Sequence, residues 1–146
     1  MDVKIIKTEK QDFLELLLLA DEPENMHSYL NRGTLFALYD DGLKGVCVVT
    51  DEGGRNFEIQ NFAITEAYQR CGYGRYLIDW VCKYHKDVCD IMHLGTGGGS
   101  GAEIFYERCG FTVSHTVKNY MLEHCREPIY ENGVQITDKV CLTKKL

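Results

Sequence analysis

The sequence predicts one domain, residues 1–146, with a mixed α/β fold. The length suits a single domain that buries a substantial hydrophobic core. Some segments alternate apolar and polar residues with the period of a strand, and others repeat apolar residues with the period of a helix. A β-hairpin signal comes first and a strand–helix–strand pattern follows in the middle of the chain, an order typical of mixed sheets.

Seven segments have the composition and bounding turns of strands. They are residues 4–6, 34–39, 43–50, 57–64, 91–94, 111–117 and 135–143. The segment Asp40-Asp41-Gly42 is a hairpin signal, because a tight turn between antiparallel strands needs residues that tolerate positive φ.

Four segments are expected to be helical. Apolar residues at three- and four-residue spacing predict helices over residues 11–20 and 73–85. Acidic residues and a proline at 21–24 suit the first turn of a further helix, which is expected to end at Gly33. A short helix is expected over residues 102–109, before Gly110.

Composition and charge exclude several functions. The net charge of 16 − 22 = −6 leaves no basic surplus for binding a nucleic-acid backbone. The longest apolar stretch, residues 16–20, is far too short to cross a membrane. The N-terminus does not resemble a signal peptide. We therefore expect a cytoplasmic protein with neither nucleic-acid nor membrane partners.

The cysteines and histidines favour neither disulfides nor a metal site. The seven cysteines are odd in number and include no C-x-x-C pair, so we expect reduced and mostly buried thiols. The five histidines show no close pairing of metal-ligand type, and His124 beside Cys125 is a weak signal, since neighbours in sequence usually point apart.

The most specific local feature is a glycine-containing turn between a strand and a helix. It consists of Gln69, Arg70, Cys71, Gly72, Tyr73, Gly74 and Arg75. Two glycines permit a tight turn, and the first amides of the helix have no internal partner, so together they can bind a pyrophosphate. The missing Gly-Lys-Ser/Thr excludes a P-loop, and Leu77 stands where a dinucleotide fingerprint has its third glycine. On spacing alone, a turn without a ligand is an equal alternative.

The strand at residues 57–64 changes phase. Phe57 and Ile59 are apolar at odd positions, whereas Phe62 and Ile64 are apolar at even positions. A regular strand cannot bury all four on one face, so we expect a β-bulge near Gln60-Asn61 that splays the strand from its neighbour. The alternative is a strand that is buried on both faces.

Three segments together resemble the GNAT superfamily of N-acetyltransferases. The Q-x-x-G-x-G turn is similar to the family's pyrophosphate loop, residues 58–64 to its fourth strand, and residues 104–111 to its later helix and exit turn. The resemblance covers residues 35–117. It implies a mostly antiparallel sheet of six to seven strands with a central splayed parallel pair, flanked by about four helices.

The resemblance also implies a cofactor and catalytic roles. Acetyl-coenzyme A is the expected co-substrate, without a metal, and its pantetheine arm is expected to pair with backbone near Phe62, Ala63 and Ile64. These amides would also polarise the acetyl carbonyl. Tyr106 matches the family's general acid that faces the coenzyme sulfur, although packing on a short helix is an alternative. Glu58 stands where some members carry a catalytic glutamate, and a solvated strand residue is the alternative.

One position departs from the family pattern. Many members place an asparagine after the fifth strand, in contact with pantetheine, where this chain has a glycine-rich stretch that ends in Ser100. Ser100 could replace that contact or cap the next helix, with Glu103 as its capping-box partner.

The acceptor is expected to be a primary amine of a small molecule, attacked directly through a tetrahedral intermediate. By resemblance, residues 26–32 and 118–135 flank its site, and the second segment carries aromatic and acidic residues that suit a cation. A protein or peptide N-acetyltransferase and a non-catalytic acetyl-CoA-binding regulatory module are the alternatives. The resemblance is also compatible with a homodimer.

Overall fold

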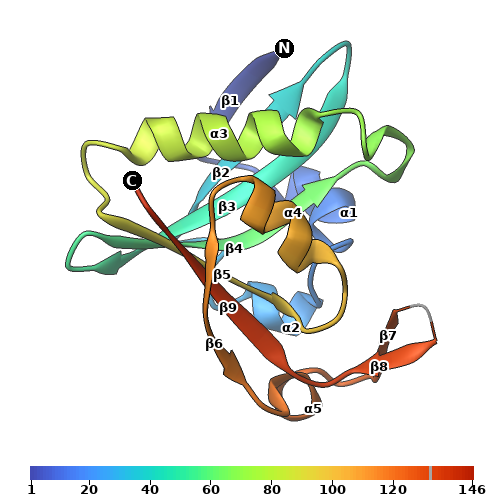
Figure 1. The fold of residues 1–146 in the computed structure, drawn as a ribbon. Coiled ribbons are helices and arrows are strands. Elements are labelled where there is room, and N and C mark those ends of the chain that lie inside the picture. Colours follow the sequence, from blue (N-terminus) through green and yellow to red (C-terminus); the bar gives the residue numbers. More distant parts are fainter. Residues whose placement is uncertain (132) are drawn as a thin grey trace.

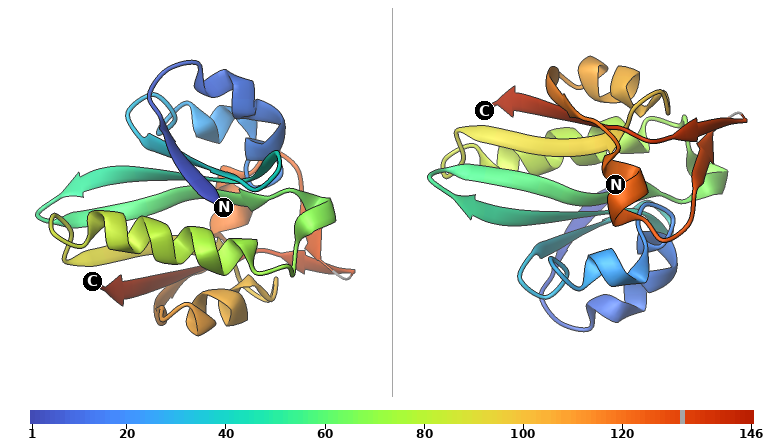
Figure 2. Two further views of the ribbon diagram at one scale, coloured as in Figure 1. Left: turned by 90° about the horizontal axis from the view of Figure 1, so that it is seen from above. Right: turned by 90° about the horizontal axis from the view of Figure 1, so that it is seen from below.

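The computed structural model describes residues 1–131 and 133–146 and contains a seven-stranded sheet with helices on both faces (Figure 1). The strands of this sheet are β1 (Asp2–Ile6), β2 (Thr34–Tyr39), β3 (Leu43–Gly53), β4 (Asn56–Ile64), β5 (Ile91–Gly97), β6 (Thr112–Val117) and β9 (Lys139–Lys145). A separate hairpin of β7 (Ile129–Glu131) and β8 (Val134–Ile136) projects beyond the main sheet (Figures 1 and 2).

Five α-helices and two 3₁₀ turns connect the described strands. They are η1 (Lys10–Phe13), α1 (Leu14–Leu17), α2 (Pro23–Met26), η2 (Glu66–Tyr68), α3 (Tyr73–His85), α4 (Ala102–Arg108) and α5 (Tyr120–His124). None of these helices is long and apolar enough to cross a membrane.

The strand order of the main sheet is β1-β2-β3-β4-β5-β9-β6. Neighbouring strands are antiparallel except for β4 and β5, which are parallel because α3 connects them as a crossover. The predicted mostly antiparallel sheet with one central parallel pair is thereby confirmed.

Each face of the sheet carries its own hydrophobic cluster. The cluster beneath α3 includes Phe36, Leu77 and Leu142, each fully buried. The opposite cluster joins α1 and α2 to β2 and β3 and includes Leu17 and Val46. Figure 2 shows the N-terminal helices (blue) and the pair α3 and α4 (green and orange) on opposite sides of the sheet.

The predicted β-bulge lies in β4 at Gln60. The pairing of β3 with β4 passes from Val48↔Asn61 to Val49↔Ile59, so Gln60 has no partner on β3. The extra residue restores the phase: Phe57, Ile59, Phe62 and Ile64 all pack against the cluster beneath α3. These apolar side chains therefore all lie on one face, with Ile59 and Ile64 buried and Phe57 and Phe62 partly buried, as the bulge hypothesis requires.

The first two helices are both shorter than the sequence predicts. The segment 11–20 forms η1 and the four-residue α1 and then continues as turns. Pro23 does occupy the first turn of α2, but the helix ends at Met26 and continues as turns. Gly33 is not its left-handed terminal residue. A Cβ at Gly33 would lie 2.8 Å from Cγ1 of Val48 and 2.9 Å from the Tyr29 carbonyl oxygen, so close packing accounts for the glycine.

The C-terminal third also differs from the prediction. The single strand expected over residues 135–143 is divided into β8 and β9, and β9 inserts between β5 and β6. The sequence did not indicate α5 or β7. The middle of the chain agrees better, since α3 spans the predicted residues 73–85 and β5 extends the predicted strand to Gly97.

All seven cysteines are free, as expected. Cys47, Cys82, Cys89 and Cys109 are buried, whereas Cys71 is exposed.

One buried histidine is expected to make the stability of the core depend on pH. His85, near the end of α3, is 4% exposed and packs against Phe36 and Phe57. Its Nδ1 lies 2.8 Å from the Val81 carbonyl oxygen, which can only accept, so Nδ1 carries the proton and donates. Burial lowers the pKa of His85 below its ordinary value, and the hydrogen bond opposes this only partly.

We therefore expect acid to destabilise the fold through His85. The unfolded chain takes up a proton on this histidine near pH 6.5, above the folded pKa, so its contribution to stability is present above that pH and lost as pH falls below it. The slope from this one site is at most about 1.4 kcal/mol per pH unit. Urea unfolding at pH 7.0 and 5.5 should show a shallower decline in His85→Gln. The same substitution at the exposed His115 is the control, and an equal decline in wild type and His85→Gln would contradict the assignment.

Candidate active site

The parallel strands β4 and β5 part in the middle of the sheet. Their pairing runs from Asn56↔Ile91 to Ile59↔Leu94 and stops at the bulge. Beyond that point β4 stays paired with β3 up to Ile64, and β5 stays paired with β9 up to Gly97. Alternate backbone groups of β4 after the bulge therefore point into the gap, where an extended ligand can pair with them.

A cavity of about 790 Å³ lies where the two strands part. Its volume is in the range of small-molecule sites. It is lined by the bulge of β4, the end of β5, α4, α5 and the N-terminal helical segment. Four of the predicted site residues line it together: Glu58, Phe62, Ser100 and Tyr106.

Tyr106 lines this cavity from α4. The ring is held edge-on by Phe62, Phe105 and Phe111, with centroids 6.1, 5.2 and 6.1 Å away. The hydroxyl makes no hydrogen bond with the described part of the chain. Burial raises the pKa of Tyr106 well above its ordinary value, so the group is protonated at neutral pH and can donate.

Glu58 and Asn61 flank the bulge on the face opposite to α3. Phe57 and Ile59 face α3, so Glu58 between them points the other way. Glu58 is half-buried and lines the cavity. The remaining predicted strand residues act differently: the side chains of Ala63 and Ile64 pack into the two opposite clusters, which leaves only their backbone to face the gap.

The loop before α3 has the backbone geometry of an anion cradle. Arg70 and Gly72 both have positive φ, 64° and 86°, which turns the chain sharply into the helix. The amides of residues 70–75 donate to no group in the described residues. They lie at the N-terminus of a 13-residue helix, where the helix dipole favours negative charge.

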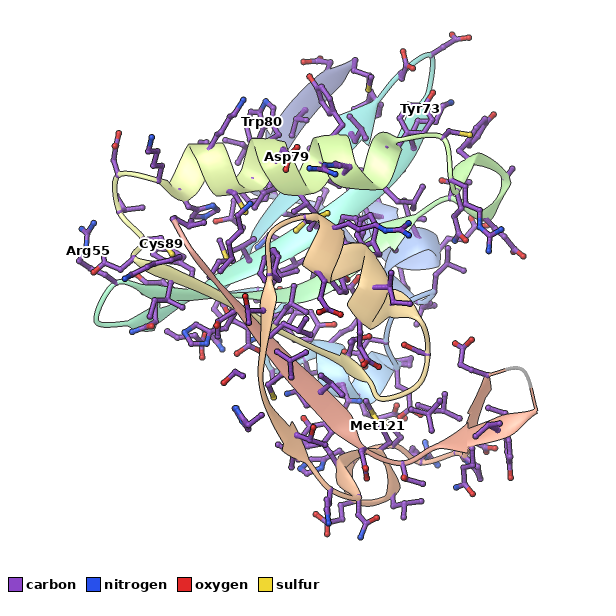
Figure 3. The ribbon with its side chains drawn as sticks, in the orientation of Figure 1. Arg55, Tyr73, Asp79, Trp80, Cys89 and Met121 are labelled. Carbon is purple, nitrogen blue, oxygen red and sulfur yellow. The ribbon has the colours of Figure 1, made fainter. Side chains whose placement is uncertain are left out.

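Two side chains of this loop hold it in place through hydrogen bonds to the rest of the protein. Gln69 donates to the Ile64 carbonyl oxygen at 3.1 Å, and the Tyr73 hydroxyl donates to Asp40 at 2.8 Å, a bond that raises the pKa of Tyr73. The exposed Arg75 lies 3.8 Å from Asp79. Figure 3 marks Tyr73 at the loop end of α3, Asp79 in the middle of that helix, and Met121 on α5, which lines the cavity.

An aromatic stack connects the loop with the cavity. The rings of Phe62 and Phe105 are stacked with centroids 5.8 Å apart. A Cβ on Gly74 would lie 3.0 Å from Cζ of Phe105 and 3.5 Å from Cζ of Phe62. Glycine at position 74 therefore allows the first turn of α3 to pack closely against these two rings.

The predicted cap of α4 needs correction. The N-cap residue is Gly101 with φ 88°, and not Ser100. The Ser100 hydroxyl still accepts from the Ala102 amide at 3.3 Å, and Glu103 accepts from the Gly99 amide at 2.7 Å. The positive φ that the turn requires at the N-cap explains why glycine, and not serine, occupies it.

The two segments expected to flank an acceptor do meet at the cavity. Ser28 and Tyr29 line it from the first segment, and Tyr120, Met121, His124, Cys125, Ile129 and Glu131 line it from the second. Residue 132 of the second segment lies outside the described residues. The α5 side is tied to α2 by Arg126, whose Nη1 lies 2.7 Å from Oε1 of Glu24.

The sequence did not single out Asp21, Tyr29 or Asn61, which form a hydrogen-bonded chain on the cavity wall. Asn61 donates to Tyr29, and Tyr29 donates to Asp21. A signal was present for Asn61 alone: it is a polar residue at the expected bulge, between apolar positions of the strand.

The cavity wall is acidic. Its lining includes Asp21, Glu22, Glu58 and Glu131 but a single lysine, Lys139, whose Nζ lies 4.4 Å above the Tyr120 ring. Such a wall favours a cationic ligand.

Sequence comparison finds a family match over the part of the chain that contains β4, the loop before α3, β5 and α4. Residues 31–113 match the family model described as an acetyltransferase (GNAT) domain. The chain is 35% identical over 135 residues to the uncharacterized N-acetyltransferase YvbK of Bacillus subtilis, a match that covers 90% of this chain and 87% of that protein.

Solved structures with the same fold cover nearly the whole chain. An acetyltransferase from Elizabethkingia anophelis with acetyl-CoA bound is 30% identical, with a TM-score of 0.93 and coverage of 99% of this chain and 97% of that chain. An IAA acetyltransferase from Bacillus cereus is 29% identical, with a TM-score of 0.90 and coverage of 99% and 100%. A Bacillus subtilis acetyltransferase in complex with CoA is 32% identical, with a TM-score of 0.88 and coverage of 99% and 97%.

Proposed function

The chain belongs to the GNAT acetyltransferase family and is therefore an acyltransferase, and we propose that it transfers the acetyl group of acetyl-CoA to a primary amine of a small cationic molecule. In this proposal residues 1–146 act as one catalytic domain. The observation that carries it is the gap between β4 and β5, which opens into a cavity lined by both Glu58 and Tyr106.

Two features support acetyl-CoA as the co-substrate. The unpaired amides of residues 70–75 at the start of α3 suit its pyrophosphate. The unpaired edge of β4 after the bulge suits pantetheine, whose amides can extend the sheet as a strand does. Relatives of similar fold that bind acetyl-CoA or CoA add to this support.

The reaction assigns one proton transfer to each of two side chains. The amine nitrogen attacks the acetyl carbonyl carbon, a C–N bond forms, and the oxyanion of the tetrahedral intermediate is stabilised by β4 amides. Glu58, directly or through a water, takes a proton from the amine. The C–S bond then breaks, and Tyr106 donates its proton to the departing sulfur.

The charge of the cavity supports a cationic acceptor. Asp21, Glu22, Glu58 and Glu131 outnumber Lys139, so a second positive charge on the acceptor improves binding. The volume of about 790 Å³ suits a small molecule.

Thiol release tests the proposed function directly. The purified protein, acetyl-CoA and each of n-butylamine, 1,4-diaminobutane and phenethylamine are incubated with a thiol reagent, and products are confirmed by mass spectrometry. We expect amine-dependent thiol release, greatest for the diamine, which is the most cationic of the three. Acetylation of peptide amines with no turnover of any small amine would contradict the proposed substrate class.

The loop is tested with Gly74→Val. A branched side chain at this position would contact Phe105 closely. It would also occupy space at the start of α3, where the pyrophosphate is proposed to bind. We expect coenzyme A affinity, measured by calorimetry, to fall at least about tenfold, equivalent to about 1.4 kcal/mol. Phe105→Leu is the matched control, because it alters the aromatic stack and leaves the loop intact. An equal loss in the control would attribute the effect to packing, and unchanged binding in a folded Gly74→Val variant would remove the loop from the site.

The acid is tested with Tyr106→Phe, which keeps the ring and removes the hydroxyl. Stability and coenzyme A affinity should change little, because the hydroxyl matters most as charge develops on sulfur. Turnover at neutral pH should fall about 10²-fold or more. The defect should shrink as pH rises toward about 8.5, where a thiolate leaves more easily without a proton. The role is falsified if Tyr106→Phe keeps near-wild-type turnover with an amine for which chemistry is rate-limiting.

A further inference from the structure

One buried polar atom on the cavity wall lacks a partner. Asn61 is 3% exposed, and its Oδ1 has no hydrogen-bond partner among the described residues. A buried polar atom without a partner is costly, and such atoms in folded proteins call for an explanation. Oδ1 itself is buried, but Asn61 is among the residues that line the cavity, so a ligand bound there is in a position to supply the missing donor.

The orientation of the Asn61 amide is fixed by its neighbours. Nδ2 lies 3.0 Å from the Leu17 carbonyl oxygen, which can only accept, so the nitrogen must face Leu17. Nδ2 also lies 3.2 Å from the Tyr29 hydroxyl. Both N–H groups are thereby used within the protein, and Asn61 offers the cavity an acceptor and no donor.

The direction of these hydrogen bonds is fixed further by Tyr29, which connects Asn61 to the Asp21 carboxylate. Its hydroxyl lies 2.8 Å from Oδ2 of Asp21, which accepts the proton, so the hydroxyl oxygen accepts from Asn61. The other oxygen, Oδ1 of Asp21, accepts from the Glu22 amide and the Asn25 side chain. Each bond in this chain polarises the next, which makes the free Oδ1 of Asn61 a stronger acceptor.

The bulge brings this oxygen to the same face of β4 as Glu58. A ligand here meets an amide oxygen and a carboxyl group, and the amide hydrogens of Asn61 are already used. Amine nitrogens carry the matching N–H donors, whereas an acceptor-only group such as a carboxylate would oppose both oxygens.

We propose that Asn61 receives the acceptor amine, with Oδ1 accepting a hydrogen bond from the amine N–H while Tyr29 and Asp21 hold that oxygen in position. The inference rests on the proposed amine acetylation and assigns the residue that aims the amine. Asn61 contacts the substrate, and Tyr29 and Asp21 act as positioning residues through it.

Steady-state kinetics of three variants test this assignment, with whichever of n-butylamine, 1,4-diaminobutane and phenethylamine the wild-type protein turns over best. Asn61→Leu removes the acceptor with little change in size. We expect its KM for the amine to rise at least about tenfold while kcat changes little, because the contact is made in both the ground and transition states. Asn61→Asp retains an oxygen and should recover part of this loss. Tyr29→Phe keeps the ring and should raise the amine KM about threefold, as expected for a lost indirect contact.

The matched control is Asn56→Leu, also on β4. Asn56 donates to the carbonyl oxygens of Gly53 and Gly54, as Asn61 does to Leu17, but it does not line the cavity. We expect its amine KM to stay within about twofold of wild type, because surface substitutions away from a site usually have small effects. Calorimetry should show unchanged coenzyme A affinity for every variant.

Several outcomes would overturn the assignment. An unchanged amine KM in folded Asn61→Leu would show that Oδ1 does not meet the amine. An equal rise in Asn56→Leu would attribute the effect to general destabilisation, and weakened coenzyme A binding would assign the oxygen to pantetheine instead. If Asn61→Leu does not fold, the smaller Asn61→Ala replaces it, and an unchanged amine KM in that variant and in Tyr29→Phe has the same force. Wild-type protein that turns over no amine would instead refute the proposed function and this inference with it.

Discussion

The extra residue at Gln60 determines both the packing of β4 and the position of the cavity. Before the bulge, Phe57 and Ile59 face α3, and after it Phe62 and Ile64 do. Without the inserted residue, half of these side chains would turn to the opposite face. The same irregularity ends the pairing with β5 at Ile59↔Leu94. One local change in backbone register therefore completes the hydrophobic core on one face and opens the sheet beside Glu58 and Tyr106.

The sequence predicted well those parts of the fold that depend on local patterns. Helix α3 has a strong apolar period and glycines at its start, and its bounds agree with the prediction. The bulge could be predicted because a phase change within eight residues is a local signal. Helix α5 and strand β7 could not be predicted, because they are only five and three residues long. Neither contains a buried residue, so neither shows a periodic pattern of apolar residues.

The candidate site likewise has parts that the sequence predicted and parts that it did not. The loop and Tyr106 belong to contiguous motifs, so the sequence indicated them. The contact of Asn61 with Tyr29 joins residues 32 positions apart, and that with Leu17 joins residues 44 apart. Hydrogen bonds of this kind depend on how α1 and α2 pack against the sheet. No periodicity within either segment encodes them.

The two sides of the cavity are held by forces of different strength. On the side proposed to bind coenzyme A, the stacked rings of Phe62 and Phe105 and Tyr73 of the loop pack against the hydrophobic core. On the side that α5 forms, Arg126 joins α5 to α2 through an exposed ion pair with Glu24, and exposed pairs contribute at most about 1 kcal/mol. Substitutions on α5, which has no buried residue, are therefore expected to cost little stability. Under the proposed function, this asymmetry would allow acceptor preference to change through α5 while the proposed acetyl-transfer residues are retained.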